Sequence, residues 1–113
     1  MRLKSALWVA AYLRRCQVEG CSAVVRRRGA EEAGAIFVRI CRLDGTSELF
    51  GPAPQSALEP GAADRSFVAC VDSQPVSDSE IEKYLSRETK FDPDLWIVEV
   101  EDRAGRNFLN IVH

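Results

Sequence analysis

The chain has 113 residues, of which 46% are hydrophobic and 28% charged, with a formal net charge of −2 and a pI near 5.4. A fold of this length buries roughly two-thirds of the surface of the extended chain, which is enough for one core without disulfides or metal. We therefore predict one domain over residues 1–113. Collagenous, low-complexity and intrinsically disordered classes are excluded, because apolar residues are plentiful and Gly (7) and Pro (5) are few.

The near-neutral total hides a split between the two parts of the chain. Residues 1–45 carry nine Arg and Lys against four acids, a balance of +5, whereas residues 46–113 carry six against thirteen, a balance of −7. Opposite charge in the two halves favours either pairing within the fold or head-to-tail association. Of these, we favour internal pairing.

The N-terminus resembles a signal peptide only briefly. An apolar run at residues 6–13 ends in Arg14 and Arg15, where a cleavage site needs small neutral residues. No stretch approaches the roughly 18 apolar residues that span a bilayer. We expect a cytoplasmic protein that does not contact membranes.

Residues 5–18 have the composition of a helix that ends before Gly20, a residue suited to the left-handed position after a helix. Apolar residues cover more than half of its surface, with Trp8 and Tyr12 four residues apart. This helix is therefore predicted to be largely buried or to form an oligomer contact.

Strands are predicted at residues 23–28 and 35–43. Asp44-Gly45 then indicates a two-residue hairpin turn, which would place Ile40 opposite Leu49. A further strand is expected at residues 66–71, after a long loop at 52–64 that we expect to be mobile.

A second helix is predicted over residues 78–90. Ser77 and Glu80 form a capping-box pattern, and Phe91 is expected on the inner face with Ile81 and Leu85. A strand beginning at Trp96 alternates apolar and acidic residues. We predict that it pairs with residues 107–112 through a turn at Ala104-Gly105, and a bulged loop or an irregular tail after Gly105 is the alternative.

The predicted order is α-β-β-β-β-α-β(-β). It describes an α+β fold, with a mainly antiparallel sheet of five to six strands covered by two helices.

Several segments together resemble a small proteobacterial family that is catalogued as a domain of unknown function. The resemblance covers essentially the whole chain, and the Phe-Asp-Pro-Asp-Leu-Trp sequence at residues 91–96 is its most specific part. It implies a single-domain cytoplasmic protein and carries no activity, cofactor or catalytic residue. The other segments are residues 7–16, 27–35 and 43–45.

Five arginines are candidates for a positive binding surface. We expect Arg26, Arg28 and Arg39 to project from adjacent strands, near Arg14 and Arg15 at the end of the first helix. Such a patch could bind RNA or DNA through phosphates. The alternative is that these side chains pair with acids inside the fold.

Cys16 is the candidate reactive thiol, because neighbouring arginines stabilise a thiolate, although a helix C-terminus opposes this effect. The four cysteines should be reduced, and their spacing predicts no metal site. The acidic residues at 92–102 lack a histidine or cysteine among them, and no nucleophile motif occurs. No cofactor is predicted.

The preferred hypothesis is a non-enzymatic interaction or regulatory module. It would bind a protein partner or a second copy through the arginine-bearing sheet face or the Trp8 and Tyr12 helix. A polyanion binder is the first alternative, and a thiol-based redox sensor or small enzyme is the second.

Overall fold

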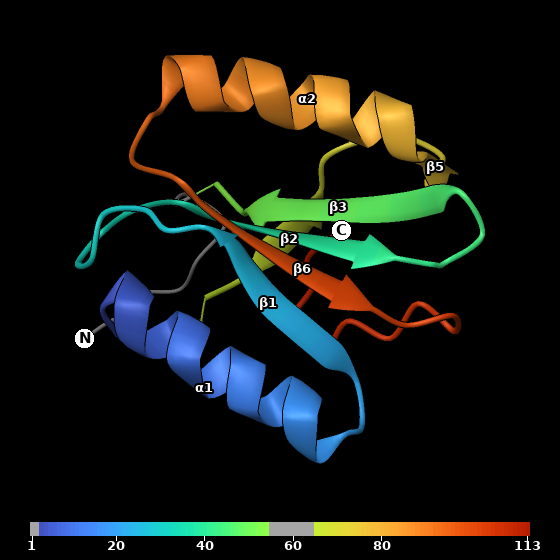
Figure 1. Ribbon diagram of the computed structural model, residues 1–113. Coiled ribbons are helices and arrows are strands. Elements are labelled where there is room, and N and C mark those ends of the chain that lie inside the picture. Colours follow the sequence, from blue (N-terminus) through green and yellow to red (C-terminus); the bar gives the residue numbers. More distant parts are fainter. Residues whose placement is uncertain (1–2, 55–64) are drawn as a thin grey trace.

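The computed structural model describes residues 3–54 and 65–113. Two helices lie on opposite sides of a six-stranded sheet that is mostly antiparallel, which confirms the predicted α+β class (Figure 1). The elements, in chain order, are α1 (Ser5–Val18), β1 (Ser22–Arg27), β2 (Ile36–Cys41), β3 (Thr46–Pro52), β4 (Phe67–Ala69), β5 (Val76–Ser77), α2 (Asp78–Phe91) and β6 (Trp96–Glu101).

The strand order across the sheet is β1-β6-β2-β3-β4, with the short β5 pairing with β3. The last strand of the chain therefore lies inside the sheet, antiparallel to β1 and parallel to β2. Because helices cover both faces at this position, β2 and β6 are buried on both sides. Their continuous apolar sequences, such as Ile36-Phe37-Val38, are typical of such central strands.

Helix α1 ends where the sequence predicted. Gly20 has a φ of +82°, its N–H donates to Gln17, and the N–H of Cys21 donates to the carbonyl of Cys16 at 2.8 Å. These two bonds form a Schellman motif, which satisfies the last carbonyls of the helix and reverses the chain directly into β1.

Each helix has its own apolar core on one face of the sheet. Val9, Tyr12 and Cys16 of α1 pack against alternate residues of the sheet such as Val98 and Phe50. Ile81 and Leu85 of α2 pack on the other face. They contact Phe37, Leu49 and Ile97.

Helix α2 begins at the predicted cap, because the Ser77 hydroxyl accepts the N–H of Glu80 at 3.2 Å. Phe91 at the other end is 87% exposed, so its predicted place on the inner face is wrong. The inner stripe ends with Leu85, and the chain after Phe91 turns through Asp92 to enter β6.

The β2–β3 hairpin forms as predicted, but its register differs by one residue. Ile40 pairs with Glu48 rather than with Leu49, and Arg39 pairs with Leu49. The loop contains three residues, because Leu43 and Gly45 both adopt positive φ and the last bonded pair is Arg42 with Thr46.

Residues 107–112 do not form the strand that a hairpin with β6 would require. β1 and β2 occupy both sides of β6, so no edge is left for a further partner. The tail instead crosses the α1 side of the sheet. Ile111 makes an isolated bridge to Phe67, and the Tyr12 hydroxyl donates to the carbonyl of Asn107 at 2.7 Å.

Most of the long loop expected at 52–64, and with it the prediction of mobility, lies outside the described residues. Within the residues that are described, neither helix is long and apolar enough to cross a membrane.

Candidate interaction edge of the sheet

Arg26 and Arg39 lie on the face of the sheet that α2 covers, where carboxylates from the acidic half surround them. The prediction that these arginines project from adjacent strands is wrong, because β6 lies between β1 and β2. Glu99 of β6 receives hydrogen bonds from Arg26 at 2.9 Å and from Arg39 at 3.0 Å. Glu82 of α2 pairs with both arginines.

Arg39 is the centre of this cluster and is only 6% exposed. Its guanidinium also contacts the Asp78 carboxylate at 3.2 Å and the Ser47 hydroxyl at 3.2 Å. We call Arg26, Arg39, Asp78, Glu82 and Glu99 the ion-pair cluster. Because its three carboxylates outnumber its two cations, the cluster offers no free positive charge, and the expected internal pairing of the two halves is found here.

The other three candidate arginines do not join the ion-pair cluster. Arg14 and Arg15 belong to α1 on the opposite face, where Arg15 pairs with Glu19 and lies over the ring of Phe108. Arg28 lies over the ring of Trp96, 5.0 Å from its centroid. The five arginines therefore do not converge on one surface.

Trp8 and Tyr12 stack on each other, with ring centroids 5.0 Å apart. Tyr12 is buried, and Trp8 is half-buried against Phe67. The pair therefore belongs to the core beneath α1 rather than to an open surface.

The Cys16 thiol is completely buried in the same core. Burial raises its pKa, and the nearby Arg15 lowers the pKa less than burial raises it. A reactive thiolate requires the opposite shift and access to solvent. All four cysteines are free thiols, and the described residues contain no cluster of three or more potential metal ligands.

β1 forms one edge of the sheet, and among the described strands it has a neighbour on one side only. Its residues are mostly exposed, including Val24 at 55% and Val25 at 36%. A β-bulge at Arg26 ends the regular part of the strand. The open stretch is therefore Ser22–Val25.

The backbone groups that face outward on β1 follow from the ladder beside it. Trp96 and Asp102 donate their N–H groups toward β2, to Ala35 and Cys41. Successive residues of a strand direct their backbone groups to opposite sides, so Glu99 directs its own toward β1, where it pairs with Val24. The N–H and C=O groups of Ala23 and Val25 therefore point to the open edge.

A groove lies on each side of this edge. The α1 groove, of 790 Å³, is lined by residues of α1 and by the start of β1, including Ala10, Ala11, Arg14, Gln17, Ser22 and Ala23. The α2 groove, of 400 Å³, lies toward the other helix and is lined by residues including Arg26, Glu82, Ser86, Lys90 and Ile97. A strand added to β1 would direct alternate side chains toward these two grooves.

Exposed apolar side chains gather around the same edge. Among the described residues, seven large apolar side chains are exposed, and five of them lie on β1, on α1 or just before α1. Leu7, Ala10, Ala11, Arg14 and Val18 recur at helical spacing and form an exposed stripe, the outer stripe of α1, which borders the α1 groove.

Comparison with known proteins shows which family shares this architecture. A family model described as a protein of unknown function, DUF1491, matches residues 3–110. The chain belongs to the DUF1491 family. This confirms the resemblance to a proteobacterial family of unknown function that was predicted from the sequence. Among curated proteins, the comparison finds no match.

Solved structures of DUF1491 proteins share the whole fold. A crystal structure of a DUF1491 protein from Caulobacter crescentus is 34% identical, with a TM-score of 0.81 and complete coverage of both chains. An NMR structure of a DUF1491 protein from the same organism is 36% identical, with a TM-score of 0.79 and coverage of 100% and 99%. A solution structure from A. tumefaciens is 43% identical, with a TM-score of 0.83 and coverage of 99% and 96%.

Sequence reasoning missed the β1 edge of this DUF1491 protein. Ala23, Val24 and Val25 were recognised as a strand. No local signal shows that β6 would pair with one side of this strand and that no other described strand would cover its second side. The one available signal was the wide apolar surface of residues 5–18, which predicted a buried helix or an oligomer contact.

Proposed function

We propose that this chain is a cytoplasmic, non-enzymatic protein-interaction module that binds an extended segment of a partner along β1. The observation that carries this proposal is the open stretch Ser22–Val25 with a groove on each side. In strand addition, main-chain hydrogen bonds supply affinity and alternate side chains in pockets supply specificity. The β1 edge offers both.

The geometry favours an extended partner rather than a small molecule. Ala23 and Val25 present backbone donors and acceptors at alternate positions, as an incoming strand requires. The two grooves are open hollows on the surface, whereas small-molecule sites usually enclose most of their ligand.

Charge limits which segments can pair. The bulge at Arg26 and the following Arg27 and Arg28 place positive charge at one end of the edge. Bulges and basic residues at sheet edges discourage indiscriminate pairing. A suitable partner strand therefore carries acidic residues where it meets Arg27 and Arg28.

The test is selection of short peptides from a random library, followed by titration against matched variants. Val25→Pro removes an N–H that points to the open edge, whereas Lys83→Arg changes an exposed side chain of α2 that lines neither groove. We expect selected peptides to bind the wild type and Lys83→Arg and to lose binding to Val25→Pro, with circular dichroism confirming that each variant is folded.

A second edge variant guards against a folding defect in the proline variant. Ala23→Pro removes the other outward N–H and should have the same effect. Peptides that bind both proline variants as tightly as the wild type would show that the β1 edge is not the binding site.

A further inference from the structure

The β1 edge can pair with an identical edge, and this determines which partner fits it best. Ala23 and Val25 are the residues whose backbone groups point outward. In an antiparallel pair, residues that point toward each other exchange hydrogen bonds. Ala23 of each chain would exchange backbone hydrogen bonds with Val25 of the other chain. The two Val24 residues would then face each other on the twofold axis.

We infer that the strand accepted by the β1 edge is β1 of a second copy of this chain, so that two sheets join into one continuous sheet. This inference rests on the proposed function, which it narrows to a self-associating module. Two further observations support the second copy as the occupant.

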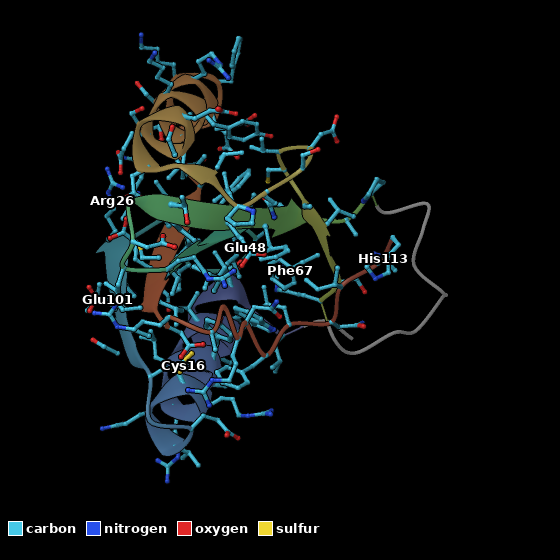
Figure 2. The ribbon with its side chains drawn as sticks, turned by 90° about the vertical axis from the view of Figure 1, so that its right-hand side faces the viewer. Cys16, Arg26, Glu48, Phe67, Glu101 and His113 are labelled. Atoms are coloured by element: carbon cyan, nitrogen blue, oxygen red, sulfur yellow. The ribbon has the colours of Figure 1, made fainter. Side chains whose placement is uncertain are left out.

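The first observation is charge complementarity between the two ends of the edge. Arg27 and Arg28 lie at one end, and Glu101 lies at the other, where it pairs in register with Ser22. Figure 2 shows Arg26 and Glu101 on the same side of the molecule, away from His113. Glu101 forms no ion pair with any of the described residues. An antiparallel copy brings the basic end of each chain to the acidic end of the other.

The same arrangement keeps like charges apart. With Val24 on the axis, Val25 of each chain pairs with Ala23 of the other, and the arginines that follow Val25 lie beside Ser22, the first residue of the other β1. Identical strands in a parallel arrangement would instead align the arginines of both chains. The charge pattern therefore selects the antiparallel register that the backbone groups also require.

The second observation is the apolar surface beside the edge. Paired residues of adjacent strands face the same side of a sheet, so both α1 helices would lie on one face, on either side of the joined β1 strands. The outer stripe of α1, with Leu7 at 56% and Val18 at 75% exposure, borders the groove between them. Ala10 and Ala11 are small enough to allow close approach of a second helix.

The register is tested by substitutions at Val24, which is 55% exposed and outside the core. Val24→Lys and Val24→Glu each place like charges across the axis. We expect sedimentation equilibrium to give a wild-type dimer, two monomeric variants and a restored dimer when the variants are mixed. Restoration on mixing is specific to a residue that faces itself.

A disulfide provides the independent measurement. Facing residues in a non-hydrogen-bonded pair have Cα atoms about 4.5 Å apart, which lies within the range of disulfide geometry. Val24→Cys should therefore form a disulfide-linked dimer under mild oxidation. The wild type, which has the same four native cysteines, and Phe91→Cys, exposed on α2, should not.

Three results would overturn the inference: a wild type that is monomeric at every concentration, a dimer that Val24→Lys does not weaken, or variants that fail to associate when mixed. A monomer whose β1 edge still binds selected peptides would refute the second copy and leave the proposed function standing. A monomer that also binds no selected peptide would refute both the second copy as the occupant and the proposed function.

Discussion

Arg39 of β2 and Glu99 of β6 are paired in register on neighbouring parallel strands, and their side chains form an ion pair of 3.0 Å. Arg39 belongs to the basic half of the sequence, and Glu99 belongs to the acidic half. Part of the charge split therefore serves to hold α2 on the sheet, through the ion pairs of Asp78 and Glu82 with Arg39. The open stretch of β1 lies outside these ion pairs.

Replacing Arg39 should destabilise the fold. Arg39→Met keeps most of the side-chain volume but removes the cation that faces Asp78 and leaves Arg26 alone to balance Glu82 and Glu99. We expect a loss of about 2 kcal/mol in the free energy of unfolding, between the values typical of exposed and buried pairs. Arg14→Met, at an exposed site, should change it by less than about 0.5 kcal/mol. Urea denaturation measures both, and equal midpoints would contradict the role of the ion-pair cluster.

The ion-pair cluster should also make stability depend on pH. The hydrogen bond from Arg26 lowers the pKa of Glu82 below its ordinary value of 4.5. A carboxylate whose pKa is lower in the folded state stabilises above its unfolded pKa and loses that contribution as the pH falls through the folded value. The stability difference between wild type and Glu82→Gln should be largest above pH 4.5 and shrink on acidification. Urea midpoints across this range that differ by a constant amount would contradict the prediction.

Gly29 should be intolerant of a side chain for reasons of space. A Cβ at this position would meet the carbonyl oxygen of Asp94 and the backbone of Leu95, so Gly29→Ala should cost about 2 kcal/mol or more. Gly20, whose φ is +82°, has open space around it, so Gly20→Ala should cost only about 1 kcal/mol from backbone strain. Thermal or urea unfolding of the two variants gives the comparison. The reverse order would contradict the packing of the Gly29 loop against Asp94.

Thiol labelling should distinguish Cys16 from the more accessible cysteines. Burial raises the pKa of all three thiols, that of Cys70 to about 11, so access to solvent decides the order: Cys16 is buried, whereas Cys41 and Cys70 are half-buried. In the native protein we expect a maleimide to modify Cys41 or Cys70 first, and Cys16 only after unfolding. Peptide mapping by mass spectrometry identifies the order. Modification of Cys16 as fast as that of free cysteine would contradict its burial and support the hypothesis of a thiol-based redox sensor.

The sequence predicted those parts of the fold that depend on local chemistry. The cap of α2 at Ser77 and the end of α1 at Gly20 could be predicted, because the hydrogen bonds responsible join residues at most five apart. The hairpin at Asp44 was also recognised. Its register was not, because the positive φ of Leu43 lengthens the loop by one residue, and this conformation is uncommon outside Gly, Asn and Asp.

The remaining features depend on which strands become neighbours. The insertion of β6 between β1 and β2 brings Glu99 to both Arg26 and Arg39, and it prevents residues 107–112 from pairing with β6. It also leaves β1 at the edge. No periodicity within β1 or β6 encodes this order, so the candidate site could be found only in the structure.

Amide hydrogen exchange at Ala23 and Val25 tests the central claim most directly. Their N–H groups point to the open edge, whereas that of Val24 lies in the ladder with β6 and serves as an internal reference. We predict that Ala23 and Val25 exchange rapidly in dilute protein and become protected together at high protein concentration or with a selected peptide. Rapid exchange of both amides under all of these conditions would contradict the assignment of β1 as the interaction edge.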